Sequence, residues 1–426
     1  MEQEELKRKL IGLWEKNTHQ SKDLISILFD YYFDAELVEY KEYDGKIVSA
    51  LFGIPYSFGY GDKYLKGLYL ISLSSEEGFK KKGMLSDLLK AFNKRASKNF
   101  DFTFIVPHSE LLADYYATQG YLNSFFILEE RFTPLHDFKK DYFLSLTDSD
   151  ERIKELKKSL YKEIKVCENQ KGEFSEEQVI QFIRSIEKKG TSAINLCHSS
   201  EDLKYLLNEK SLRNLNHYIT HDSDGKITGI AFSHMEDIKR IRIAGFYVSD
   251  LCSYYVLLDY IKKTYPDFSL SVNSSDSKYQ THSIIQQTYA SSNPAGGDLD
   301  NTFSVIEIPF NYNRLLQPLG MARLLRFDNI LKYIAETRSD IDLKLYLRDW
   351  DGSQEKEGKT VKKLFTIKNG TFKEENILDP IKDHSVLSLS SKELSELLLR
   401  KNDSSNLIME AFGIPRLNLQ IKLLPY

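Results

Sequence analysis

A short basic loop between a strand and a helix is the feature of this sequence best suited to chemistry. The apolar run Leu68–Leu73 leads into Ser74–Phe79, three lysines and Gly83, and a helical pattern then runs over 84–92. A helix N-terminus presents free backbone N–H groups and the positive end of the helix dipole. Gly83 lets the backbone approach a ligand closely. The pattern predicts a pyrophosphate cradle, and with it a nucleotide cofactor.

The same loop can be interpreted as a solvated basic turn before an amphipathic helix. Lysine runs usually have that role, and a basic residue shortly before a glycine is weak evidence by itself. The whole chain holds 58 Lys and Arg against 62 Asp and Glu, a formal net charge of −4. The lysines at 80–82 are therefore a local feature, and the composition argues against a nucleic-acid or anionic-membrane partner.

Length and composition limit the class of protein. A chain of 426 residues is too long for one hydrophobic core and suggests about three domains. Hydrophobic residues make up 41% and charged residues 28%, as in a soluble globular protein. The charged N-terminus is unlike a signal peptide, and no apolar run approaches the roughly 20 residues of a membrane span. We therefore expect a cytoplasmic protein without a membrane partner.

The cysteines and histidines predict neither a disulfide framework nor a metal site. Cys167, Cys197 and Cys252 are far apart and odd in number. The 9 histidines have no metal-ligand spacing. We expect no metal cofactor and a reducing compartment.

The elements that position the basic loop form a first unit, predicted over residues 1–143. Two helices are expected over 4–16 and 20–33, and Asp44-Gly45 between two β-rich runs predicts a hairpin. Around the loop, strands are expected over 65–73, 100–106 and 125–131, and helices over 84–92 and 111–118. This mixture predicts one sheet flanked by helices.

A second unit, predicted over residues 144–309, begins with a helix expected over 153–166. It then repeats the order hairpin, strand, helix, strand, with Asp224-Gly225 as the turn. The repeat lacks a basic loop ending in glycine, because Ser249–Cys252 stands at that place. We therefore expect one cofactor site per chain.

A second motif follows the basic loop within the first unit: Tyr115-Tyr116-Ala117-Thr118-Gln119-Gly120-Tyr121. Here the chain resembles the GNAT superfamily of N-acetyltransferases, whose cofactor motif is a strand, Arg/Gln-x-x-Gly-x-Gly/Ala and a helix. Their next motif is a helix that ends near a tyrosine, followed by glycine and an aromatic residue. Both motifs occur here, in order and at the usual separation.

The three-unit layout is similar to one branch of that superfamily, the Eis-like (enhanced intracellular survival) acetyltransferases. That branch has an N-terminal acetyltransferase domain, a degenerate central copy and a third domain similar to sterol carrier proteins. Pro318–Asp328 and the helix expected over 391–399 fit the third domain, predicted over 310–426. The implied fold class is α+β, with tandem GNAT-like domains, each a mixed central sheet flanked by helices. The resemblance also implies acetyl-CoA as cofactor, a small-molecule amine as acceptor, and a homo-oligomer, commonly a hexamer.

The resemblance carries over to positions that would bind acetyl-CoA. Leu73 and Ser75 match strand positions whose backbone pairs with the pantetheine arm, and Ser109 lies near the start of the following helix. The pyrophosphate loop is matched by Lys80, Lys81, Lys82, Gly83, Met84 and Leu85. The lysines stand where the branch usually has arginines, which costs bidentate phosphate contacts.

Two residues match the groups that move protons in this branch. Tyr116 matches the tyrosine that gives a proton to the leaving thiolate, and the C-terminal carboxylate of Tyr426 matches the base. Acyl transfer to an amine needs a base, an acid and oxyanion stabilisation, and a tyrosine with a pKa of about 10 can be the acid. Tyr116 can also be interpreted as a packed aromatic residue, and Tyr426 as a frayed terminus.

The acceptor site is predicted from an acidic and aromatic stretch that includes Phe29, Asp30 and Phe33. Asp30 would attract a cationic amine of an aminoglycoside-like or polyamine acceptor, and the rings would flank it. An amphipathic helix with core aromatics and solvated acids explains the same pattern. Two other functions stay open: a lipid- or partner-binding protein with a vestigial transferase site, and an acetyltransferase of protein lysines or N-termini.

Overall fold

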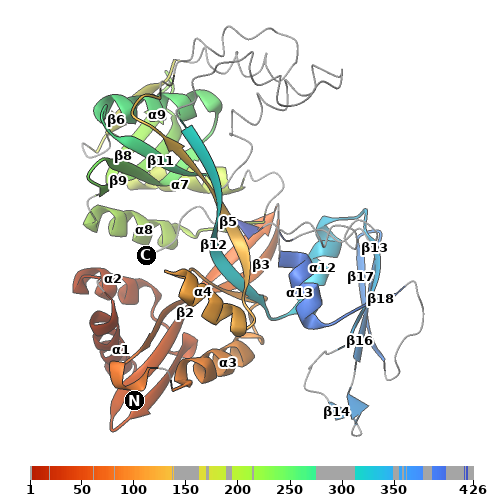
Figure 1. Cartoon of the computed structure of the whole chain (residues 1–426). Coiled ribbons are helices and arrows are strands. Elements are labelled where there is room, and N and C mark those ends of the chain that lie inside the picture. The colour runs from red at the N-terminus through yellow and green to blue at the C-terminus, as the bar shows by residue number, and fades with distance from the viewer. Residues whose placement is uncertain are drawn as a thin grey trace. The chain divides into compact units, whose positions relative to one another are not determined.

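The structure is a computed structural model (Figure 1) and divides into two compact units, each described by itself below. Unit 1 comprises Met1–Phe126, Gly190–Ser199 and Pro318–Gln420, and unit 2 comprises the rest of the chain. The described residues are 2–18, 20–60, 62–80, 82–136, 138, 163–168, 172–188, 194–213, 215–274, 312–348, 355–356, 359–360, 362–377, 386–399, 417 and 419–420. The predicted domain boundaries at 143 and 309 fall outside them and stay predictions.

Unit 1 begins with two helices and a hairpin, as predicted. Helices α1 (Gln3–Asn17) and α2 (Lys22–Tyr32) bury their apolar faces, and Ser21 caps α2 by accepting the Leu24 N–H. Strands β1 (Val38–Tyr43) and β2 (Lys46–Tyr60) pair antiparallel. Asp44 and Gly45 take φ values of 48° and 72°, the left-handed conformation that this two-residue turn requires.

The sheet of unit 1 has the strand order β19-β7-β2-β3-β4-β12. Strand β3 (Lys63–Ser75) pairs antiparallel with β2 and parallel with β4 (Phe102–Ile105). Three strands come from distant parts of the chain: β7 (Ile194–Cys197), β12 (Tyr312–Leu324) and β19 (Leu419–Gln420). None of the three was predicted, because β7 and β19 are very short and β12 has no alternation strong enough to distinguish it.

Helices α3 (Met84–Ala96) and α4 (Glu110–Thr118) pack against this sheet. A short turn of 3₁₀ helix, η2 (Glu77–Phe79), precedes α3, and another, η1 (Ala35–Leu37), precedes β1. The apolar cluster beneath them includes buried residues of β3, α3 and α4, and Tyr121 from the turn that follows α4: Leu68, Leu70, Leu88, Leu89, Phe92, Tyr116 and Tyr121. This core holds the basic loop and the tyrosine helix on one side of the sheet.

The C-terminal part of unit 1 has its own four-stranded sheet. Its order is β17-β16-β13-β18, and Asn369 and Gly370 form the β16–β17 hairpin turn with φ values of 49° and 75°. The strands are β13 (Asp342–Leu347), β16 (Lys362–Lys368), β17 (Thr371–Ile377) and β18 (Leu387–Leu389), with the short pair β14 (Glu355–Lys356) and β15 (Lys359–Thr360). The helices are α12 (Phe327–Thr337) and α13 (Ser391–Leu399).

The sheet of unit 2 has the order β11-β10-β9-β8-β6, and the second half of β5 (Leu122–Phe132) pairs with β11. Its strands are β6 (Lys165–Glu168), β8 (Asn216–His221), β9 (Ile227–Asp237), β10 (Arg240–Val248) and β11 (Ser269–Ser274). Its helices are α7 (Glu176–Lys188), α8 (Ser200–Leu212) and α9 (Leu251–Thr264). Strand β10 pairs antiparallel with β9 and parallel with β11, as β3 does with β2 and β4 in unit 1.

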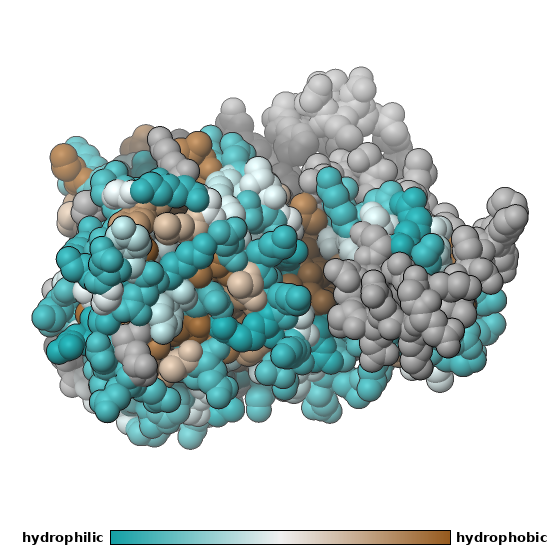
Figure 2. All heavy atoms as spheres, turned by 90° about the horizontal axis from the view of Figure 1, so that it is seen from below, coloured by the Kyte–Doolittle hydropathy of each residue, from teal (hydrophilic) through white to brown (hydrophobic). Residues whose placement is uncertain are grey.

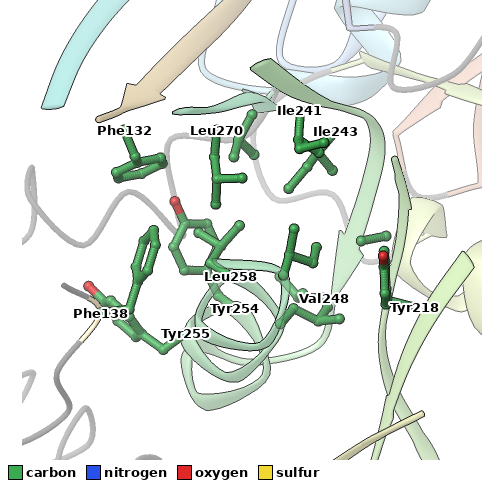
Figure 3. Packing of buried hydrophobic residues seen from close by; sticks show 14 of the residues in the cluster. Phe132, Phe138, Tyr218, Ile241, Ile243, Val248, Tyr254, Tyr255, Leu258 and Leu270 are labelled. Carbon is green, nitrogen blue, oxygen red and sulfur yellow. The ribbon is translucent and has the colours of Figure 1, made fainter. Parts of the chain in front are cut away.

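Aromatic residues of α9 fill the core of unit 2. Figure 3 shows Tyr254, Tyr255 and Leu258 of this helix lying against Phe132 and Leu270 of the sheet. The order hairpin, strand, helix, strand is confirmed by β8, β9, β10, α9 and β11. The helix expected over 153–166 lies mostly outside the described residues, and its last two residues belong to β6 instead. The antiparallel pairing of Lys165–Glu168 with β8 explains the strand.

Two half-buried histidines of unit 2 make its stability sensitive to acid. Burial lowers the pKa of His217 and of His234, and the nearby charges of Lys210 and Arg242 lower them further. Since the unfolded chain binds protons more readily, the free energy of unfolding should fall as the pH drops below about 6.5. Urea unfolding should show a lower midpoint at pH 5.5 than at pH 7.5, and replacing both histidines with Gln should shrink that difference. An undiminished difference would contradict this cause.

Candidate active site

The candidate site lies in unit 1 where strands β3 and β4 stop pairing. Their parallel ladder joins Gly67, Leu68 and Tyr69 to Phe102, Thr103 and Phe104 and then ends. Strand β3 continues over 70–75, and there its recorded partners among the described residues are all on β2. The other edge of β3 therefore offers backbone N–H and C=O groups to an extended ligand, which would bind as an added strand.

A β-bulge interrupts β3 in the half that pairs with β2 but not with β4. Ser72 has a φ of 55°, and the pairing with β2 skips from Phe52–Ile71 to Ala50–Ser74. A bulge redirects the strand that carries the extra residue. Leu73 and Ser75, predicted to pair with the pantetheine arm, both follow it.

Ser49 of β2 holds the strand in place just after the bulge. Its hydroxyl donates to the Ser74 carbonyl at 3.2 Å and lies 2.7 Å from the Ser75 hydroxyl. The Ser75 hydroxyl is thus engaged by Ser49 of β2. A ligand beside β3 would therefore bond to the backbone of Ser75 and not to its side chain. Sequence reasoning missed Ser49, because the contact joins residues 26 apart on neighbouring strands.

The predicted basic loop leads from β3 into α3 and is exposed. Lys80 forms an ion pair with Glu77, and the Lys82 ammonium lies 4.9 Å from the centre of the Phe79 ring. Gly83 has a φ of 75°, the left-handed conformation that suits glycine, and nothing lies within 4 Å of where a Cβ would stand. Lys81 lies outside the described residues.

The first turn of α3 has no side-chain cap among the residues that the structure describes. Met84 and Leu85, both half-buried, form the beginning of this turn. Helices α2 and α4 are different, since Ser21 and Ser109 accept N–H bonds at their N-termini. No described side chain caps the N–H groups of this first turn, and the positive end of the helix dipole lies beside them. The start of α3 is therefore suited to bind an anion.

The corresponding helix of unit 2, α9, is capped at its N-terminus by the side chain of Asp250. Asp250 accepts hydrogen bonds from the Ser253 N–H at 2.9 Å and the Ser253 hydroxyl at 3.0 Å at the start of α9. A fixed negative charge there repels an anionic ligand while it satisfies the helix. Unit 2 therefore has a physical reason for lacking the predicted cradle, beyond the missing glycine.

Tyr116 is buried near the C-terminal end of α4, in the apolar cluster that also contains residues of α3 and β3. Its ring lies 5.2 Å from the ring of Tyr115 and 6.2 Å from that of Tyr121, in edge-on contacts. Burial raises the pKa of the Tyr116 phenol well above its usual value. The phenol holds its proton at neutral pH, as an ordinary tyrosine does, and the raised pKa makes it a weaker acid than an exposed tyrosine.

Tyr115 brings α4 to the first turn of α3. Its hydroxyl lies 3.0 Å from the hydroxyl of Ser86, the third residue of α3. Ser109, predicted near the cofactor, is exposed and caps α4 by accepting the Leu112 N–H at 3.3 Å. Sequence reasoning gave Tyr115 no role, although its place next to Tyr116 in the motif could have suggested one.

The residues predicted for the acceptor lie in the first helices. Phe29 is fully buried between Trp14 and Phe52, with ring centroids 5.6 and 5.4 Å away. Asp30 is exposed and forms an ion pair with Lys7 at 2.7 Å, and Phe33 is half-buried beside Phe29. This placement favours the alternative of a core-packing helix with solvated acids. Tyr426, the predicted base, lies outside the described residues.

The predictions also concern metal-ligand groups, membrane-spanning helices and the surface. Over the described residues, His, Cys, Asp and Glu form no group of three or more that could hold a metal ion. Among the described helices, none is long and apolar enough to cross a membrane. On the face drawn in Figure 2, hydrophilic residues predominate at the described surface and hydrophobic ones form small patches between them.

Comparisons with known proteins identify the fold. No protein-family model and no curated protein matches the sequence. A conserved protein of Enterococcus faecalis, called a probable N-acyltransferase, is similar in structure, with a TM-score of 0.64, 13% identity, and coverage of 97% of this chain and 92% of its own. A GCN5-related N-acetyltransferase of Anabaena variabilis has a TM-score of 0.61, 12% identity, and coverage of 96% and 92%.

A third similar structure is Eis1 of Mycobacterium abscessus, with a TM-score of 0.56, 8% identity, and coverage of 97% of this chain and 91% of its own. These likenesses extend over nearly the whole chain, and both units have the same strand–helix–strand order. The mixed α/β fold class predicted from the sequence is confirmed. The chain has the fold of the GCN5-related N-acetyltransferases, in a tandem arrangement.

Proposed function

We propose that the protein is an acetyl-CoA-dependent N-acetyltransferase that acetylates a primary amine. The observation that supports this most strongly is the uncapped start of α3, reached through Gly83 from a strand with a free edge. Both features lie beside the helix that carries Tyr116. An uncapped helix alone would suit any anion, whereas the free strand edge in addition favours a ligand with an extended amide-bearing arm.

The residues at the site fit coenzyme A. The backbone of Leu73 and Ser75 would pair with the pantetheine arm, and the N–H groups after Gly83 would hold the pyrophosphate. Lys80 and Lys82 would add positive charge, Lys80 by exchanging Glu77 for phosphate. When bound, the cofactor supplies an acetyl group activated as a thioester.

Tyr116 is the proposed acid, because it stands at the position of the acid in the GNAT motif and a phenol is protonated at neutral pH. A backbone N–H of the bulged strand near Leu73 would stabilise the developing oxyanion. The base, by resemblance to Eis-like enzymes, is the C-terminal carboxylate of Tyr426. Its task is to take a proton from the acceptor amine.

Deleting Tyr426 should lower kcat by about 10²-fold, the lower end of the usual contribution of a general base. The affinity for acetyl-CoA should not change, because the deletion spares the loop and the strand. Steady-state kinetics and calorimetry on the shortened protein check both quantities. Unchanged turnover would remove Tyr426 from the mechanism.

The acceptor class is the part of the proposal that needs a screen. Release of free thiol from acetyl-CoA should be measured with aminoglycosides, polyamines and lysine-containing peptides. We expect a small cationic amine to give the fastest turnover, because the resemblance to Eis-like enzymes implies a small-molecule amine as acceptor. Faster turnover with peptides would favour protein acetylation. Acetyl-CoA binding without turnover on any amine would favour a vestigial site.

Other features of the proposal come from the resemblance alone. They are a homo-oligomer, commonly a hexamer in Eis-like enzymes, and a third domain similar to sterol carrier proteins. The cytoplasmic location is also a proposal, supported by the composition and the cysteines. The absence of nucleic-acid and membrane partners is a proposal supported by the net charge of −4, and the absence of a metal partner is one supported by the spacing of the histidines and cysteines.

A further inference from the structure

A buried hydrogen-bond cluster joins three elements of unit 1 beneath the candidate site. Its members are Asn93 of α3, Thr103 of β4 and Tyr121, which follows α4. The Thr103 hydroxyl donates to Asn93 Oδ1 at 2.8 Å, the Tyr121 hydroxyl donates to the same oxygen at 3.2 Å, and the two hydroxyls lie 3.0 Å apart. All three side chains are at most 3% exposed, so these bonds form in a medium where breaking one is costly.

Tyr121 connects this cluster directly to Tyr116. Its backbone N–H donates to the Tyr116 carbonyl at 3.1 Å, and its ring meets the Tyr116 ring edge-on at 6.2 Å. Gly120, with a φ of 83°, makes the sharp turn that brings Tyr121 back under α4. The hydroxyl of Tyr121 is thus fixed to α3 and β4 while its backbone and ring are fixed to Tyr116.

The end of α4 is also held from β12. The Arg323 guanidinium donates to the Gln119 carbonyl, and Arg323 pairs with Thr103 across the β12–β4 ladder. Together with the contact between Tyr115 and Ser86, this holds the C-terminal part of α4 at further points. Tyr121 differs from Arg323 and Tyr115 in that its backbone N–H donates to the carbonyl of Tyr116 itself while its hydroxyl is bonded to both α3 and β4.

We propose that Tyr121 is a positioning residue, whose hydroxyl, held by Asn93 and Thr103, sets the place of Tyr116 relative to α3. This role rests on the proposed function, in which α3 holds the cofactor and Tyr116 donates a proton to it. Proton transfer requires donor and acceptor within hydrogen-bond reach, and a displacement of about 1 Å can cost up to about 10²-fold in rate. The Tyr121 hydroxyl touches no reacting group itself.

The test is Tyr121→Phe, which removes one oxygen and keeps the ring and the backbone. We expect kcat to fall about tenfold while the Kd of acetyl-CoA, measured by calorimetry, stays within about twofold, because the loop and β3 are untouched. In a Tyr116→Phe background the same substitution should have no further effect on kcat. In the protein without cofactor, hydrogen exchange should become faster for the amides of α4 and stay unchanged for those of α9.

Two further variants separate positioning from general destabilisation. Tyr247→Phe removes the hydroxyl of a fully buried tyrosine in unit 2 and should leave kcat unchanged. Thr103→Val leaves the Tyr121–Asn93 bond and should lower kcat less than Tyr121→Phe. It also keeps the idea testable if Tyr121→Phe does not fold.

The outcomes distinguish this role from the proposed function. If the unaltered protein turns over amines and Tyr121→Phe has the same kcat, or lowers kcat equally with and without Tyr116, the positioning role is wrong. If the unaltered protein binds acetyl-CoA but acetylates no amine, the proposed function fails, and the role of Tyr121 fails with it.

Discussion

Replacing Tyr116 with Phe should lower kcat by about 10²- to 10³-fold while the Kd of acetyl-CoA changes little. The substitution removes the proposed proton donor, and general acids contribute on the order of 10²- to 10⁴-fold. The ring remains, so its edge-on contacts with Tyr115 and Tyr121 persist and the core around it keeps its packing. Saturating both substrates separates kcat from binding, and calorimetry gives the Kd.

Tyr115→Phe is the matched control for this result. It removes a hydroxyl from the neighbouring residue of the same helix and breaks the contact with Ser86, but leaves Tyr116 intact. We expect a much smaller loss of kcat. A wild-type kcat in Tyr116→Phe, or equal losses in the two variants, would show that the proton comes from elsewhere.

Replacing Gly83 with Asp should raise the Kd of acetyl-CoA by at least about 100-fold. The substitution places a carboxylate at the start of α3, where Asp250 stands at the start of α9. A negative charge there opposes the pyrophosphate, and an opposing like charge near a bound anion costs several kcal/mol. The positive φ of Gly83 adds strain to the substitution.

Gly83→Asn separates charge from strain. Asparagine has the size of aspartate and tolerates the left-handed conformation, but it is neutral. We expect it to weaken binding much less than Gly83→Asp does. Equal losses would assign the effect to backbone shape, and wild-type affinity in both variants would place the pyrophosphate elsewhere.

Local patterns were enough to predict most elements of unit 1. The hairpin at Asp44-Gly45, the strand before the basic loop and the helices on each side of it were each signalled by residues within one element. The strands β7 and β12 could not be predicted in their places, because they join the sheet from about 140 and 200 residues further along the chain. No sequence window contains the partners that select them.

The candidate site was predictable as a motif but not as a set of contacts. Gly83 follows from the strand–loop–helix pattern and Tyr116 from the resemblance to the GNAT motif, whereas Ser49 and the Asn93–Thr103–Tyr121 cluster depend on pairings between elements. The acceptor residues show the limit of a pattern, since an aromatic on an amphipathic helix looks the same in a core and in a pocket. Phe29 has no exposed surface, so for that residue the core interpretation agrees with the structure.

The most direct test is to titrate the purified protein with acetyl-CoA in a calorimeter. We predict saturable binding with one site per chain, because α3 is open and α9 is closed by Asp250. Free coenzyme A should compete for that site, and Gly83→Asp should weaken acetyl-CoA binding at least about 100-fold. No binding by a folded protein, or two equivalent sites per chain, would contradict the proposal that the start of α3 is the cofactor site.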